Sequence, residues 1–308
     1  MSDLIGSTQL SDSKDCPAYS EKPIRQKIIT RNAQIGENLT IRRALPHRER
    51  RMIGAWCFLD HFGPLDLKKN KGLNIAPHPH IGLQTFTWTL QGEILHRDSL
   101  GFSQVIQPGQ VNLMTAGRGI AHSEESLPDS VLHGVQLWIA LPDAVRNRVP
   151  EFVHYSEIPA LQHDGLFIQV LAGELLDVRA PAKIYSPLLG LDLHAKQKTD
   201  TTLPLNPKFE YGILPLVGHI EVEGEIVEIG TLLYLGSGRS NLSIRVPEAA
   251  RILIIGGEPF AEEVLLWWNL VARTKKEIRD AVHDWNHHAR FGEVQGYHGD
   301  RLSAPPLE

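Results

Sequence analysis

Two short motifs in this chain carry side chains that can bind a metal ion. His78 and His80 form the first, and His122 and Glu124 form the second. Each motif places two side chains at positions i and i+2, which point to the same face of a β-strand. Two such strands side by side would present three imidazoles and one carboxylate to a single point. This ligand set suits a divalent transition metal and leaves coordination positions open for chemistry.

The charge of such a site favours an anionic substrate. Three neutral imidazoles, one carboxylate and a divalent ion leave a single net positive charge, which an enolate or phenolate would neutralise. Coordination would also lower the pKa of the substrate hydroxyl, as it does for metal-bound water. With four protein ligands, an octahedral ion keeps two positions, one for a substrate oxygen and one for dioxygen. Glu124 could serve as a general base if it leaves the ion.

The composition is typical of a globular protein without a basic surface. Apolar residues make up 42% of the 308 residues, charged residues 22%, and the formal net charge is −5. The densest basic run, residues 42–51, is short and is interrupted by Glu49. Direct nucleic-acid binding is therefore not expected. The length is sufficient for two domains.

The cysteines and the N-terminus predict a cytoplasmic protein. Cys16 and Cys57 are the two cysteines, so no disulfide framework is expected and a reducing compartment fits. The N-terminus has neither the cationic start nor the apolar core of a secretory signal. The chain contains no apolar run of about eighteen residues, so no membrane span is expected.

Short apolar runs separated by Gly, Pro and Asn between residues 27 and 259 predict an all-β sandwich or barrel. The clearest strand is predicted over residues 78–90. Its even positions, which include Gln84, Phe86 and Trp88, are expected to face the barrel interior, and its threonines the outside. For the two aromatic residues, core packing is the simpler interpretation, and stacking on a flat aromatic substrate is the alternative.

An internal repeat indicates two related β domains. Residues 90–119 and 216–238 share the order strand, glycine turn, strand and glycine pair. We therefore predict a loosely ordered tail over residues 1–27 and an N-terminal metal-binding domain over 28–160. Residues 161–308 are predicted to form a C-terminal domain without metal, plus a C-terminal helix and tail.

A helix is predicted near the C-terminus, on the outside of a domain. Thr274 and Glu277 have the spacing of a capping box. The apolar residues that follow at helical spacing are Ile278, Ala281, Val282, Trp285 and Ala289.

Together these motifs resemble the pirin family of bicupins. The matching segments are residues 59–64, 78–80, 114–124, 133–138 and 267–269. The resemblance implies an all-β fold of two jelly-roll cupin domains. It also implies one metal ion in the N-terminal domain, usually iron, held by the four residues of the two opening motifs.

The resemblance leaves two functions open. Some pirins resemble quercetin 2,3-dioxygenases, which implies ring cleavage of a flavonol with Glu124 as the catalytic base. Others act as iron-dependent transcriptional co-regulators through protein contacts, with the metal as a sensor or clamp. Fe(II) is the expected ion, and Mn, Ni, Co, Cu and Zn are alternatives.

One position departs from the pattern of many cupins, which place a glutamate ligand four residues after the His-x-His pair. Here that residue is Gln84, a poor metal ligand, so Glu124 is expected to be the sole carboxylate and Gln84 a hydrogen-bonding residue behind the ligands. Arg118, between two glycines, could guide an anionic substrate or pair with an acid in a loop. His61 could approach the site and His96 could lie behind the ligands, but both are expected to be structural. Asp98 is expected to cap a loop rather than to act as a catalytic acid.

Overall fold

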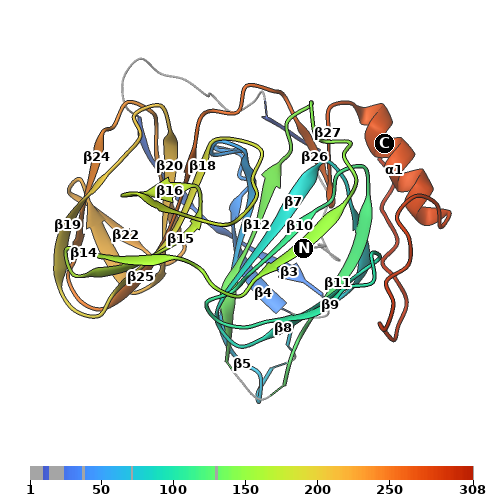
Figure 1. Cartoon of the computed structure of the whole chain (residues 1–308), viewed down its shortest axis with the longest axis horizontal. Coiled ribbons are helices and arrows are strands. Elements are labelled where there is room, and N and C mark those ends of the chain that lie inside the picture. Colours follow the sequence, from blue (N-terminus) through green and yellow to red (C-terminus); the bar gives the residue numbers. More distant parts are fainter. Residues whose placement is uncertain (1–9, 14–23, 37–38, 71, 129–130, 308) are drawn as a thin grey trace.

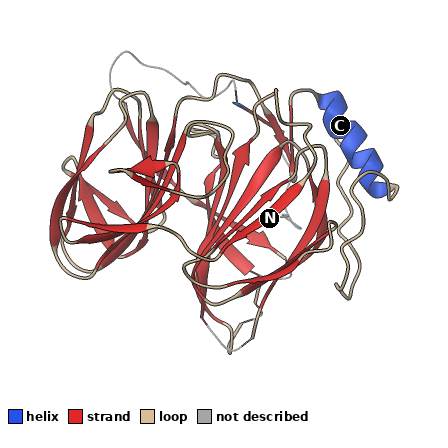
Figure 2. Ribbon diagram, viewed as in Figure 1, coloured by secondary structure: helices blue, strands red, loops and turns tan. Residues whose placement is uncertain are grey.

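The computed structural model describes residues 10–13, 24–36, 39–70, 72–128 and 131–307. Two β barrels lie side by side along the long axis of the molecule, with a single helix at the far end of the first barrel (Figures 1 and 2). Each barrel combines a seven-stranded and a four-stranded sheet. The prediction of an all-β chain with a C-terminal helix is confirmed.

The first barrel contains eleven strands. Its large sheet contains β3 (Arg31–Ile35), β4 (Leu39–Leu45), β5 (Trp56–Asp66), β7 (Leu83–Gln91), β10 (Val111–Thr115), β12 (Val131–Ala140) and β13 (Glu151–Tyr155). Its small sheet contains β6 (Asn74–His80), β8 (Ile94–Asp98), β9 (Ser103–Ile106) and β11 (Ile120–Ser126).

The second barrel has the same number of strands. Its large sheet contains β2 (Arg25–Ile29), β14 (Ala160–His163), β15 (Leu166–Ala172), β18 (Leu188–Ala195), β20 (Glu210–Val217), β23 (Thr231–Leu235) and β25 (Ala250–Gly257). Its small sheet contains β19 (Thr199–Pro204), β21 (His219–Val222), β22 (Glu225–Glu228) and β24 (Asn241–Val246). A short hairpin joins β16 (Glu174–Leu175) to β17 (Val178–Arg179).

The two barrels have the same strand order, which confirms the predicted repeat. The large sheets run β13-β10-β7-β12-β5-β4-β3 and β2-β23-β20-β25-β18-β15-β14, and the small sheets run β6-β11-β8-β9 and β19-β24-β21-β22. Gly92 and Gly218 turn the chain at equivalent places, with φ of 78° and 71°. These left-handed conformations carry little steric cost in glycine, which explains why the repeat is visible in the sequence.

The N-terminal boundary differs from the predicted one. Strand β2 completes the large sheet of the second barrel, in the place that β13 holds in the first. Residues 25–27 are therefore not part of a loose tail, and β1 (Ser11–Asp12) pairs with β26. The rest of the predicted tail, residues 1–9 and 14–23, lies outside the described residues.

The segment after the second barrel, which includes the C-terminal helix, packs on the first barrel. It contains β26 (Leu265–Trp267), β27 (Leu270–Ala272) and α1 (Lys275–Asn286). A bridge joins Leu270 to Ile81 of the first barrel, and the amide of Val271 donates to the Ile81 carbonyl. Apolar side chains of α1 and the C-terminal residues pack with Ile81 and Ala121.

Helix α1 has the predicted capping box, in which Thr274 and Glu277 bond each other's backbone amides. The predicted apolar face is buried at Ile278, Ala281, Val282 and Trp285. Ala289 lies beyond the end of the helix and is exposed, because the helix ends at Asn286. Among the described residues, no helix combines the length and apolarity needed to cross a membrane.

A continuous core joins the two barrels. Apolar side chains of β7, β10 and β12 from the first barrel share one buried cluster with side chains of β18, β20 and β25 from the second. The indole Nε1 of Trp56 donates to the carbonyls of Leu189 and Gly256, at 3.2 and 3.1 Å. The outer face of the first barrel's large sheet is therefore buried against the second barrel, and the two candidate metal-binding motifs lie on β6 and β11 of the small sheet.

Candidate metal centre

The predicted strand over residues 78–90 is two strands in different sheets. Strand β6 ends at His80, β7 begins at Leu83, and the chain turns a corner between them. Gly82 makes this corner with φ of 67°, and a Cβ atom there would lie 2.1 Å from the carbonyl oxygen of Val271. The corner shifts the alternation by one residue. The even positions of β6 and the odd positions of β7 therefore face the barrel interior.

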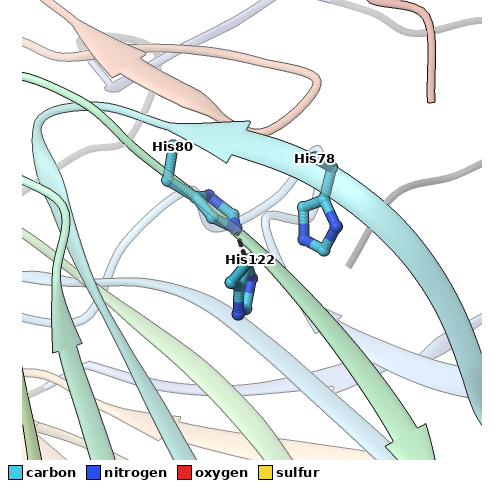
Figure 3. Close-up of side chains that lie close together, drawn as sticks. All are labelled: His78, His80 and His122. Carbon is cyan, nitrogen blue, oxygen red and sulfur yellow. Dashed lines mark hydrogen bonds between the residues drawn. The ribbon is translucent and has the colours of Figure 1, made fainter. Parts of the chain in front are cut away.

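Three of the predicted ligands converge inside the first barrel. His78 and His80 come from β6, and His122 comes from the neighbouring strand β11, where it lies opposite His78 (Figure 3). One ring nitrogen of each lies within 4.8 Å of one from each other ring. The Nε2 atoms of His80 and His122 are 3.0 Å apart. All three side chains are buried.

Backbone carbonyls determine which nitrogen of two rings can bind a cation. His78 Nδ1 donates to the carbonyl of Ala76 at 2.9 Å, and His80 Nδ1 donates to that of Asn269 at 2.8 Å. Because a carbonyl oxygen only accepts, both rings carry a lone pair on Nε2. Burial lowers the pKa of His78 to about 3 and that of His80 well below its usual value. Both imidazoles are therefore neutral, as metal ligands must be.

Glu124 supplies a carboxylate beside His122. A bulge separates these two residues on β11, and Glu124 lies within 4.8 Å of nitrogen atoms of His122 and His96 rather than in the group of three histidines. Its Oε1 accepts long hydrogen bonds, both 3.4 Å, from Thr87 Oγ1 and Gln136 Nε2. Burial raises the pKa of the Glu124 carboxyl.

Two strand residues that the sequence analysis did not assign to the site lie directly against it. His96 and Asp98 are an i, i+2 pair on β8, with His96 Nε2 3.0 Å from Asp98 Oδ2 and His96 Nδ1 3.3 Å from His122 Nδ1. The spacing is the same as in the other two motifs and was the available signal. Asp98 does cap a loop, since its Oδ1 accepts from the amides of Leu100 and Phe102, and this role masked the other one.

Three side chains predicted to lie near the ligands face the other way. Gln84 donates to Thr115 Oγ1 at 2.9 Å and to the carbonyl of Lys183 at 3.0 Å. Phe86 and Trp88 belong to the core shared by the two barrels, and Trp88 Nε1 donates to Asp192 of the second barrel at 2.7 Å. The interior position between them is Thr87. The prediction was wrong because it continued the alternation through the corner at Gly82.

Arg118, for which the sequence left a substrate-guiding role and an ion pair in a loop open, lies at the surface. Its side chain is exposed, its amide donates to the carbonyl of Arg148, and its carbonyl accepts from Arg290 Nε. The aromatic side chains that do lie at the site come from other strands. The Trp138 ring meets that of His80 at 5.1 Å between centroids, and Phe152 stacks on His96 at 4.3 Å.

The donor set fits a divalent transition metal. His78 Nε2 and Glu124 Oε2 are buried and have no hydrogen-bond partner among the described residues. Unpaired buried polar atoms are costly, and a cation would pair both at once. Nitrogen and carboxylate oxygen donors suit iron, manganese, nickel, cobalt, copper and zinc alike, so this set implies a divalent metal without selecting one.

Comparison with known proteins gives the same family over both barrels. The family model described as Pirin matches residues 38–139, and that described as Pirin C-terminal cupin domain matches residues 190–292. A Pseudomonas aeruginosa protein named as a candidate quercetin 2,3-dioxygenase is 51% identical over 309 residues, which cover 100% of this chain and 98% of that protein. Pirin of Homo sapiens is 26% identical over 86% of this chain and 93% of that protein.

A solved structure extends the similarity to three dimensions. The crystal structure of a quercetin 2,3-dioxygenase from Acinetobacter baumannii superposes with a TM-score of 0.90. The two chains are 49% identical, and the alignment covers 92% of this chain and 96% of that one. The similarity therefore includes both barrels and their arrangement.

Proposed function

Because this chain belongs to the pirin family of bicupins, we propose that it is a metal-dependent dioxygenase that opens the heterocyclic ring of a flavonol such as quercetin. The observation that carries the proposal is the buried set of His78, His80, His122 and Glu124 in a chain so similar to a quercetin 2,3-dioxygenase. We propose Fe(II) as the native ion.

The bound metal would supply a Lewis acid that lowers the pKa of a flavonol hydroxyl and brings it together with dioxygen. The chain's own residues perform the remaining tasks. His78 and His80 present fixed lone pairs, so the ligands need little rearrangement. Glu124 can receive the hydroxyl proton on Oε2 once this oxygen leaves the ion, because burial raises the pKa of the carboxyl and Thr87 and Gln136 hold its other oxygen.

The aromatic surface for a flat substrate is assigned here to Trp138 and Phe152, which replace Phe86 and Trp88 in this role. Each lies against a histidine of the site, and both are buried. The low exposure of the site also excludes water from the reacting atoms. A flavonol can reach them only if covering side chains move.

Turnover under air tests the proposal. Protein stripped of metal and reloaded with Fe(II) should consume oxygen as the flavonol absorbance falls. Glu124→Gln should lower the rate by about 100-fold or more, because an amide cannot take up the proton. His219→Ala, in the second barrel, should leave the rate unchanged. Oxygen uptake by the loaded wild type no faster than that of the metal-free protein, with iron, manganese, nickel and copper, would reject the dioxygenase.

One observation favours a second candidate, the co-regulator that acts through protein contacts. The four metal-site side chains are at most 2% exposed, which suits a sensor whose ion never meets a large substrate. In that case the loaded protein should bind flavonols no better than the metal-free protein. A partner protein should then distinguish the ferrous from the ferric form.

A further inference from the structure

We infer that Asp98 and His96 form a positioning chain that holds His122 in the one tautomer able to bind the metal. The inference rests on the metal site of the proposed function, but not on the reaction. It concerns the third histidine, because backbone carbonyls already determine the tautomers of His78 and His80. Among the described residues, no such carbonyl is paired with His122, whose Nδ1 faces another imidazole.

This positioning chain begins at the carboxylate of Asp98, whose two oxygens are held in place. Asp98 Oδ1 accepts from the amides of Leu100 at 2.9 Å and Phe102 at 3.1 Å, which orients the group on its loop. Its second oxygen, Oδ2, lies 3.0 Å from His96 Nε2. A carboxylate can only accept, so the proton of a neutral His96 resides on Nε2 and its Nδ1 carries a lone pair.

The same argument applies to the next residue, His122. His96 Nδ1 and His122 Nδ1 are 3.3 Å apart. Because His96 Nδ1 carries a lone pair, the proton between them belongs to His122 Nδ1. His122 Nε2 then carries a lone pair, as do the Nε2 atoms of the other two rings. His80 Nε2 and His122 Nε2, 3.0 Å apart, would face each other with two lone pairs, an arrangement that a cation stabilises.

Packing holds the chain in place. His96 stacks on Phe152 with an interplanar angle of 11°, and His96, Asp98 and His122 are all buried. In the small sheet, His122 lies directly opposite Asp98, and Glu124 lies opposite His96. Strand β8 therefore supports both site residues of β11. Mutation of a residue that hydrogen-bonds to a metal ligand typically changes the metal affinity by roughly 10–100-fold.

Three substitutions separate a proton-positioning role from a packing role. Asp98→Asn keeps an oxygen for the two loop amides but turns an NH₂ group toward His96. That reverses the donors along the chain and places a proton on His122 Nε2. In contrast, His96→Gln alone keeps the original direction of the hydrogen bonds, since the glutamine oxygen can accept from His122 and its NH₂ group can donate to Asp98. His96→Leu removes the acceptor.

The measurement is Zn(II) affinity by chelator competition, together with ¹⁵N NMR of the histidine rings in the full-length chain. We expect Asp98→Asn and His96→Leu to weaken Zn(II) binding by roughly 10–100-fold and His96→Gln by less than about fivefold. The matched control is His154→Gln in the same barrel, where His154 bonds Asn112 and none of the four site residues. It should bind Zn(II) like the wild type.

The NMR readout does not require metal or activity. Wild-type His122 should show the Nδ1–H tautomer, and Asp98→Asn should show Nε2–H. An unchanged tautomer with unchanged Zn(II) affinity in Asp98→Asn would overturn the inference while leaving the proposed dioxygenase intact. Loss of an imidazole from the zinc coordination shell in His96→Leu would overturn it in favour of His96 as a ligand. A wild type that binds no Zn(II) would overturn both.

Discussion

The two barrels of this molecule share one strand order but have opposite interiors. In the small sheet of the first barrel, the inward positions hold histidines and carboxylates. The register of the small sheets makes Thr201, Leu203, Ile244 and Val246 of the second barrel equivalent to His78, His80, His122 and Glu124. Ile220 and Val222 take the places of His96 and Asp98.

The second barrel shows what this fold requires for stability alone. All of these aliphatic residues pack in one buried cluster that fills its interior. Among the described residues, both groups with metal-ligand spacing lie in the first barrel. The polar interior of the first barrel is therefore not demanded by the fold. His78 Nε2 and Glu124 Oε2 are buried and unpaired among the described residues, whereas the equivalent positions of the second barrel hold Thr201, with one unpaired hydroxyl, and the apolar Val246.

The largest effect should come from removing a ligand in the first barrel. His122→Ala should weaken divalent-metal binding by more than about 100-fold, since ligands matter more than the residues behind them. Chelator competition measures this. Ile244→Ala, at the equivalent position of the second barrel, should lose stability but bind metal as the wild type does. A similar loss of affinity in both variants would break the comparison.

Exchanging residues between the two interiors should cost unequal amounts of stability. Ile244→His places an imidazole among aliphatic side chains and should cost about 1–3 kcal/mol of unfolding free energy, because a buried donor and acceptor lose their water. His122→Ile in metal-free protein should cost far less. Denaturant unfolding with chelator present compares them, and a stable Ile244→His would show that the second interior tolerates polar groups.

The next prediction concerns stability at the interface between the two barrels. Trp88→Phe removes the hydrogen bond to Asp192, which is also held by Arg251. It should lower the unfolding free energy by about 1–3 kcal/mol, because a buried carboxylate loses a partner. Metal affinity should stay within about twofold. A large loss of affinity at unchanged stability would return Trp88 to the site, as the sequence alone had suggested.

A pH dependence of stability is expected at the same interface. His61 Nε2 and His133 Nε2 are 2.8 Å apart and buried, and burial, with help from Arg42 and Arg251, lowers the pKa of His133 to about 4. The unfolded chain binds a proton below about pH 6.5, whereas the folded one does not until about pH 4. Stability should be complete above pH 6.5 and fall toward pH 4, by up to about 1 kcal/mol per pH unit.

His133→Gln tests whether His133 causes this loss of stability in acid. It should flatten the decline between pH 6.5 and 4 in denaturant titrations, while His163→Gln, on the far strand β14, should not. An identical decline in His133→Gln would assign the acid sensitivity to other groups.

The ligands could be predicted from the sequence because they are local. Two i, i+2 pairs on strands and the family motifs around them are visible without any tertiary information, as is the repeat marked by Gly92 and Gly218. What could not be predicted depends on the corner at Gly82. One residue of left-handed backbone moves Thr87 into the barrel and turns Phe86 and Trp88 out of it. Alternation cannot detect such a shift.

Contacts between segments far apart in the sequence also could not be predicted. Nothing in residues 265–286 indicates that they pack on the first barrel, yet the carbonyl of Asn269 orients His80. Strand β2 likewise joins a sheet whose other strands begin more than a hundred residues later. Local periodicity predicts that such segments are strands, but their partners are determined by the packing of the complete chain.

Metal stoichiometry tests the central claim most directly. The wild-type chain, stripped and then reloaded with a divalent metal, should retain one ion per chain after gel filtration, and Ile244→Ala should retain the same. His122→Ile should retain almost none while remaining folded. Two ions per chain in the wild type, or an undiminished content in His122→Ile, would contradict a single metal centre in the first barrel.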